Sequence, residues 1–299
     1  MLSRIYVQQQ KQQLRTIRYG IKTPIIQHVY KQMYTTNQQP PKIKEEEEPS
    51  KEIRTAPKVL GLRQTPVVNR DGWLERKKNK LRDLTDYDKA FQAHAAERRH
   101  LVEEATKSYF ADAHEMRKHG GKMYHAADKL IKADKAGYMP DFEGINLDKK
   151  PVHTTDLLAG KVSLMSFVYA KYGETHVNSF VEPLLQHFKN NPKVQLVEVN
   201  VQENLLKQWL LKAFVPSIRK NLPEERKQNY TLLLKDISRV RKHLDMTNQH
   251  IGYVYIIDEQ CKIRWTAHGD ATKEEIGNML GMLEYLSSNN NNNKKVASS

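Results

Sequence analysis

The chain has 299 residues and a net charge of +14, from 49 lysine and arginine residues against 35 aspartate and glutamate residues. Eight of the basic residues lie in the first 44 positions, where acidic residues are absent, so more than half of the excess charge lies in this N-terminal stretch. Cys261 is the only cysteine, which excludes an intramolecular disulfide, a Cys-x-x-Cys redox pair and a zinc site of several cysteines. No apolar run approaches the roughly 20 residues that a membrane-spanning helix needs.

Residues 1–36 combine basic side chains with apolar positions three or four apart. Leu14, Ile17, Ile21 and Ile25 fall on one helical face. A basic, acid-free amphipathic start is typical of a mitochondrial presequence, whereas a secretory signal has a continuous apolar core. We therefore predict a mitochondrial presequence over residues 1–36, with a disordered basic tail as the alternative.

Two segments separate this start from the predicted domain. Residues 37–82 are rich in proline, glutamine and charge, which predicts a flexible linker. Residues 83–138 are expected to form a helical extension, because apolar positions recur at helical spacing from Leu84 to Met116. A helix of that length lies either along a partner or membrane surface, or against its own domain, and the pattern is compatible with both.

Residues 139–286 are predicted to form a domain of alternating strands and helices. Residues 162–169 form an almost continuous apolar run, which is typical of a central strand buried on both faces. The pattern next predicts a helix over 174–189, a strand over 194–199, a helix around 205–210 and an added helix over 223–243, where proline marks the start and apolar residues repeat at helical spacing.

A β-hairpin followed by a helix is the clearest pattern in the chain. The first strand is the aromatic and β-branched run Tyr253–Ile257, and the second alternates apolar and other side chains from Ile263 to Thr266. Thr272 and Glu275 form a capping box that begins the helix. The fold class that we predict is α/β, a thioredoxin-like mixed sheet flanked by helices and preceded by a long N-terminal helix. The asparagine-rich residues 287–299 are expected to be a disordered tail.

The chemistry of redox-active thioredoxin-like domains is missing from its usual place. Their nucleophilic cysteine follows the first core strand at a helix N-terminus, but residues 169–174 hold no thiol here, and Gly252 stands where these folds place a proline. Cys261 lies at the hairpin turn beside Lys262. We interpret Cys261 as a small buried residue, with a reactive thiolate as the alternative.

Other catalytic and ligand-binding signals are also missing. The sequence contains no glycine-rich phosphate loop, HExxH, GxSxG or calcium-loop motif. The five histidines between positions 94 and 125 are spaced so that no successive pair shares a helical face, which argues against a metal site. We therefore predict a protein without enzymatic activity, metal or cofactor.

Three stretches resemble a known family: the hairpin residues 252–269, the entry MPDFEGINL at 139–147 and the segment YFADAHEMRKHGGK at 109–122. The chain is similar to the mitochondrial ATP synthase assembly factors that act on the proton-channel subunit a (subunit 6) of the membrane sector, over roughly Leu84 to Leu286. This resemblance implies a chaperone bound peripherally to the matrix side of the inner membrane. It implies that newly made subunit a is the partner, held competent to join the c-subunit ring. The family has no catalytic residues to carry over.

Tyr253, Arg264 and Trp265 in the hairpin are the candidate partner-binding residues, because an exposed tryptophan beside an arginine suits a binding surface. The alternative is a tryptophan packed in the sheet with an arginine at its rim. Two other functions remain open: a redox protein that uses Cys261, and a mitochondrial ribosome- or RNA-associated protein. Nucleic-acid binding is not expected of the domain itself, because residues 140–286 hold 19 basic against 18 acidic residues.

Overall fold

The computed structural model describes residues 54–57, 59–68, 70, 75, 78, 111–189, 191–203 and 205–296. All of them belong to the unit Lys51–Ser299, whereas the unit Met1–Ser50 lies outside the described residues. The predicted presequence and most of the predicted helix over 84–116 therefore also lie outside this range. The end of that helix is described as α5, Ala111–His119.

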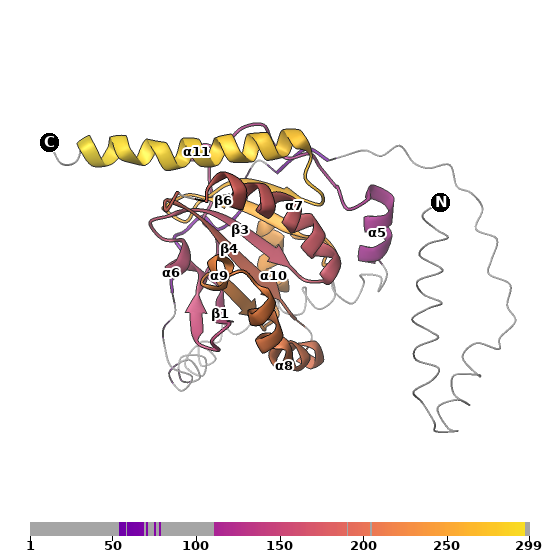
Figure 1. The fold of residues 1–299 in the computed structure, drawn as a ribbon. Helices are drawn as coiled ribbons and strands as arrows, with labels where there is room; N and C mark the ends of the chain where they lie inside the picture. Colours follow the sequence, from indigo (N-terminus) through magenta and orange to yellow (C-terminus); the bar gives the residue numbers. More distant parts are fainter. Residues whose placement is uncertain are drawn as a thin grey trace, which may run out of the picture. The chain divides into compact units, whose positions relative to one another are not determined.

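A mixed sheet in the order β2-β1-β5-β4-β3-β6-β7 forms the centre of the described residues (Figure 1). The strands are β1 Glu143–Asn146, β2 Pro151–His153, β3 Val162–Val168, β4 Val194–Val201, β5 Tyr230–Leu233, β6 Tyr253–Ile257 and β7 Ile263–His268. β3 is parallel to β4 and antiparallel to β6, and β7 is antiparallel to β6. A parallel pair extended by an antiparallel hairpin is the thioredoxin-like arrangement, so the predicted fold class is confirmed.

The helices follow the strands in chain order. Their bounds are α6 Thr154–Leu158, α7 Lys171–His187, α8 Leu205–Asn221, α9 Glu224–Lys227, α10 Ser238–Arg241, the 3-10 helix η1 Lys242–Leu244, and α11 Lys273–Val296. The predicted capping box is present: the backbone N–H of Glu275 donates to the Thr272 hydroxyl at 3.1 Å, and the Thr272 N–H donates to the Glu275 carboxylate at 2.9 Å.

The helix α11 runs as far as Val296 and so includes most of residues 287–299, which the sequence predicts to be a tail. Asparagine costs a helix well under 1 kcal/mol per residue relative to alanine, and extending a formed helix avoids the nucleation cost.

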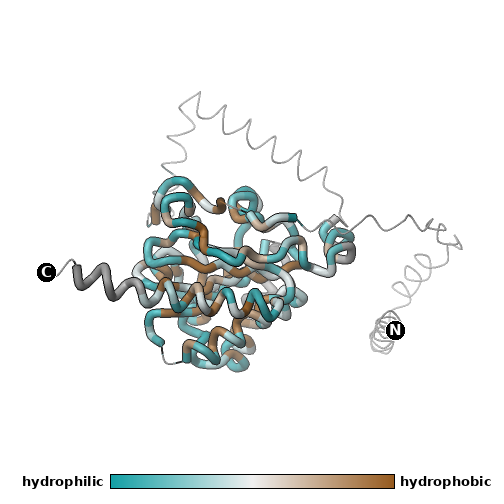
Figure 2. Tube along the Cα trace, turned by 90° about the horizontal axis from the view of Figure 1, so that it is seen from above, coloured by the Kyte–Doolittle hydropathy of each residue, from teal (hydrophilic) through white to brown (hydrophobic). Residues whose placement is uncertain are grey.

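The two faces of the sheet are covered by different parts of the chain. The helices α7 and α11 pack on one face, with Val177, Phe180, Leu184, Met279 and Leu283 buried there. The other face is covered largely by residues that precede β1, together with the segment before β6; the side chains buried there include Leu60, Met123, Tyr124, Met139, Met246 and Ile251. Figure 2 shows hydrophobic residues concentrated along the inner strands and hydrophilic residues along the outer loops.

This packing includes part of the predicted linker, and it corrects one expectation. The predicted flexible linker includes Leu60, which is buried, and Leu62, which forms a β-bridge with Tyr138. The added helix predicted over 223–243 is wrong, because this stretch divides into α9, β5, α10 and the start of η1. β5 is a strand because it completes the sheet between β1 and β4. The helical spacing of apolar residues that the sequence shows runs across two separate elements, β5 and α10.

Candidate functional site

The candidate site lies where thioredoxin-like folds carry their chemistry, at the start of α7 and the loop before β6. We call residues 247–252 the β6 loop. Ala170 caps α7 in an extended conformation without a side-chain hydrogen bond. A Cβ atom added to Gly252 would lie 2.2 Å from the carbonyl oxygen of Gly173. The backbones of α7 and the β6 loop therefore meet where a redox-active domain places its thiols and its proline. The described residues contain no cis peptide bond.

His176 fills the space beneath this contact. Its Nδ1 accepts a hydrogen bond from the Gly252 N–H at 3.3 Å, and Tyr172 packs edge-on against its ring with the ring centroids 4.9 Å apart. A Cβ atom on Gly121 would lie 3.0 Å from the ring, so the backbone of the preceding segment also closes over it. Burial lowers the pKa of His176. The lowered pKa favours the neutral form of this imidazole.

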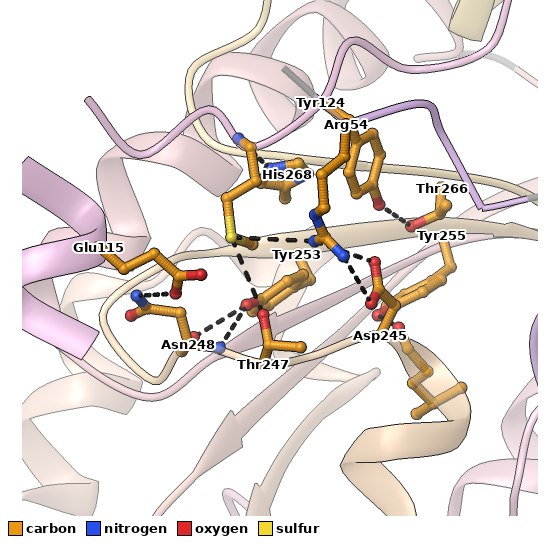
Figure 3. Close-up of polar contacts among 12 residues, drawn as sticks. Arg54, Glu115, Tyr124, Asp245, Thr247, Asn248, Tyr253, Tyr255, Thr266 and His268 are labelled. Carbon is orange, nitrogen blue, oxygen red and sulfur yellow. Dashed lines mark hydrogen bonds and ion pairs between the residues drawn. The ribbon is translucent and has the colours of Figure 1, made fainter. Parts of the chain in front are cut away.

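The β6 loop is bound to α5 by polar contacts (Figure 3). The side-chain amide of Asn248 donates to the Asp112 carbonyl oxygen at 2.7 Å and to the Glu115 carboxylate at 2.9 Å. The Tyr253 hydroxyl donates to the Asn248 carbonyl oxygen at 3.0 Å and accepts from the Asn248 N–H at 2.9 Å. Tyr253 therefore shapes the loop from inside the core, where burial raises the pKa of its hydroxyl.

The segment after α5 continues across the end of the sheet. The Met123 N–H donates to Nε2 of the buried His268 at 2.7 Å. Because Nε2 accepts, the neutral ring carries its proton on Nδ1. Burial lowers the pKa of His268 well below its usual value, and the nearby Lys122 ammonium adds to this effect. Arg54 donates to both Asp245 carboxylate oxygens at 3.4 Å and lies over the Tyr124 ring (Figure 3).

Lys122 anchors the same segment to the start of α11. Its ammonium group lies 2.5 Å from the Glu275 carboxylate and donates to the carbonyl oxygens of His268 and Asp270, both at 3.0 Å. The other Glu275 oxygen accepts from the Ala126 N–H at 2.8 Å. Burial opposes the charge on Glu275, but these hydrogen bonds outweigh it and lower the pKa of the carboxyl. The Glu275 carboxylate therefore has two roles: it caps α11, and it binds the segment that contains Lys122 and Ala126.

The predicted partner-binding residues contact the protein's own chain. Trp265 is 1% exposed, and its indole N–H donates to the Ala127 carbonyl oxygen at 2.7 Å. Arg264 donates to the Ile131 carbonyl oxygen at 2.7 Å and to Asp258 at 3.1 Å. Tyr253 is fully buried. This geometry matches the alternative interpretation, a packed tryptophan with an arginine at its rim.

We call residues 127–139 the strap, because they run along the outer edge of β7. Backbone hydrogen bonds join Ile131 to Arg264, Ile263 to Gly137 and Met139 to Cys261, at 2.7–2.8 Å. An uncovered edge strand offers unpaired N–H and C=O groups to other chains. The strap satisfies these groups along β7, a role that sequence patterns missed because an extended cover segment has no period of its own.

Cys261 lies at the hairpin turn with φ of 63° and is 5% exposed. Burial raises the pKa of its thiol to about 11, and the Asp258 carboxylate acts in the same direction. A thiolate is the reactive form, so the environment of Cys261 opposes reactivity. Within the part of the chain that the structure describes, no group of three or more His, Cys, Asp or Glu side chains is arranged to hold a metal ion.

None of the described helices is both long and apolar enough to cross a bilayer.

Comparisons with known proteins identify related chains. A family model described as "ATP10 protein" matches residues 40–286. The chain is 30% identical over 245 residues to "Mitochondrial ATPase complex subunit ATP10" of Saccharomyces cerevisiae, covering 75% of this chain and 84% of the relative. It is 28% identical over 186 residues to "Probable mitochondrial ATPase complex subunit atp10" of Schizosaccharomyces pombe, covering 62% and 68%.

Among solved structures, the chain is similar to the thioredoxin domain of a thiol-disulfide oxidoreductase from Bacteroides vulgatus. That similarity has a TM-score of 0.34 and 18% sequence identity, and it covers 49% of this chain and 95% of the other.

Proposed function

The chain belongs to the ATP10 family, and we propose that it is a non-catalytic assembly factor of mitochondrial ATP synthase. Its client is newly made subunit a (subunit 6) of the membrane sector, which it holds until subunit a joins the c-subunit ring. The protein works on the matrix side of the inner membrane, bound peripherally. The family membership supports the mitochondrial role in ATP synthase assembly, and the resemblance of the hairpin and entry motifs supports the choice of client.

The observation that carries the non-catalytic part is the closed contact between Gly252 and Gly173. Redox activity needs a thiolate at the start of α7 and space for a substrate beside it. Here the first turn of α7 carries no thiol, and a single added methyl group at Gly252 would meet a backbone oxygen at 2.2 Å. Binding to a client is therefore the function that this scaffold supports best.

A chaperone of this kind works by covering apolar segments of its client until the permanent neighbour replaces it. Such a surface needs exposed apolar side chains. Five large apolar residues are exposed within the described part of the chain: Val59, Val67, Tyr172, Phe214 and Tyr285. They are scattered over several elements, so we propose that the client contacts more than one of them.

The experiment that tests this function is a deletion strain that carries tagged subunit a. Without the protein we expect subunit a to be made normally but to be depleted from complexes that contain the c ring. Re-expression of the wild type should restore the association, and Cys261→Ser should restore it equally, because the buried thiol has no chemical role. Normal arrival of subunit a at the c ring in the deletion strain would refute the proposal.

The same strain separates the redox alternative. If Cys261→Ser folds with the wild-type melting temperature but fails to restore assembly, the thiol is needed and the non-catalytic proposal is wrong. A thiol-dependent peroxidase assay on the two purified proteins then shows whether a reaction is involved.

A further inference from the structure

The helix α8 combines positive charge with large apolar residues. Four of its residues are basic, none is acidic, and leucine, tryptophan, phenylalanine, valine and isoleucine make up much of the remainder; the sequence is LLKQWLLKAFVPSIRKN. A helix with this composition is typical of segments that lie in the interface of a membrane, with apolar residues toward the acyl chains and lysines near the headgroups.

One side of α8 is used by the fold. Val215 is buried in a small cluster with Leu147 and Leu232, and Ile218 and Leu222 pack against this cluster. These contacts fix the helix against the sheet near β1 and β5, at the end of the structure opposite α11 (Figure 1).

The other side of α8 is uncovered within the described residues. Phe214 is 55% exposed, and its neighbours Ala213, Pro216, Ser217 and Lys220 are also exposed. Among the described side chains of α8, this side therefore presents an exposed aromatic ring, Phe214, beside an exposed lysine, Lys220.

We propose that α8 is the element that binds an anionic lipid surface, with Phe214 entering the acyl boundary and Lys220 near the headgroup phosphates. The absence of acidic residues favours lipid over a protein partner, because phosphate groups complement lysines while an apolar client segment does not. Arg219 is already paired with Asp148, whereas Lys220 is exposed and has no such pairing among the described residues. This inference names the helix that makes the peripheral membrane contact in the proposed function, and it rests on that function.

A site-specific probe tests this, since the basic N-terminal residues of the full chain can also bind anionic vesicles. In a Cys261→Ser background, Ser217→Cys on α8 and Ser288→Cys on α11 are each labelled with an environment-sensitive fluorophore. Vesicles of phosphatidylcholine are compared with vesicles that also contain phosphatidylglycerol. We expect a blue shift and quenching by nitroxide lipids at position 217 with the anionic vesicles, and a smaller change at position 288.

Two variants then measure how much Phe214 and Lys220 each contribute to lipid binding. Phe214→Asp and Lys220→Glu should each raise the lipid concentration needed for the half-maximal shift at position 217 by about tenfold. Lys273→Glu is the matched control for Lys220→Glu, because Lys273 is an exposed lysine at the start of α11, and it should have no effect. Thermal melts confirm that all variants fold.

If the fluorophore at position 217 stays in water while the protein binds anionic vesicles, α8 is not the lipid contact and the inference is wrong. The same holds if Phe214→Asp impairs assembly in mitochondria but leaves the lipid response unchanged, which would make α8 a protein-binding helix. Failure of the proposed function is measured separately, by normal association of subunit a with the c ring in the deletion strain.

Discussion

Gly252→Ala probes the backbone contact that closes the candidate site. The new Cβ atom would lie 2.2 Å from the Gly173 carbonyl oxygen and 2.9 Å from a methyl group of Val177. The oxygen belongs to α7 and cannot turn away without distorting the helix, so the overlap should cost up to about 3 kcal/mol. Replacing glycine also restricts the unfolded chain, which returns about 0.4–1 kcal/mol. We expect a net loss of about 2 kcal/mol in the free energy of unfolding.

Thermal and urea unfolding followed by circular dichroism measure this loss. For a domain of this size, about 2 kcal/mol lowers the melting temperature by about 4–8 °C. The matched control is Gly277→Ala in α11, where an added Cβ meets nothing within 4 Å and should stabilise the helix by up to about 1 kcal/mol. If Gly252→Ala is as stable as the wild type, the two backbones do not pack as closely as described and the argument for a sealed site fails.

Three further predictions concern buried polar groups. Cys261, with a pKa of about 11 against the usual 9.0, should react with a thiol reagent at pH 8 about 100-fold more slowly in the native protein than in urea; comparable rates would contradict its burial. His268 has a lowered folded pKa, so its contribution to stability is complete above pH 6.5 and is lost as the pH falls below it, by at most about 1.4 kcal/mol per pH unit. Urea titrations at several pH values should show a shallower decline for His268→Gln than for the wild type, and equal slopes would count against this assignment. Trp265→Phe removes the hydrogen bond to Ala127 and leaves a cavity where the larger ring is buried, so together these losses should cost about 2–3 kcal/mol, with earlier proteolytic cleavage in the strap. Unchanged cleavage would show that Trp265 does not secure the strap.

The central elements of the fold were predictable because each carries a strong local signal. The run over 162–169 is almost continuously apolar, and β3 is buried on both faces in the structure. The turn after Ile257 separates two strands that pair as a hairpin. The capping residues Thr272 and Glu275 fixed the start of the last helix to within one residue.

Other elements depend on partners that are distant in the chain. β5 has four residues, too few to distinguish a strand from a helix by period, and it is a strand because β4 and β1 lie beside it. Leu60 and Tyr124 belong to irregular segments whose position is set by the sheet face that they cover.

The candidate site was predictable only in part. The absence of a thiol after β3 and the presence of Gly252 could be read from the sequence. The contact of Gly252 with Gly173 could not, because it joins residues 79 apart through backbone atoms alone. The hydrogen bond between Asn248 and Glu115 could not be predicted either, because these residues are 133 positions apart in the sequence.

The cover provided by residues before β1 also constrains how quickly the molecule can form. Arg54 meets Asp245 across a separation of 191 residues, and Lys122 meets Glu275 across 153. Contacts with such large sequence separation raise the contact order and slow folding, because chain entropy is lost before the contacts form. The segments that contain Arg54 and Lys122 can therefore dock only after the residues around Asp245 and Glu275 are in place, and until then the sheet face that they cover stays exposed.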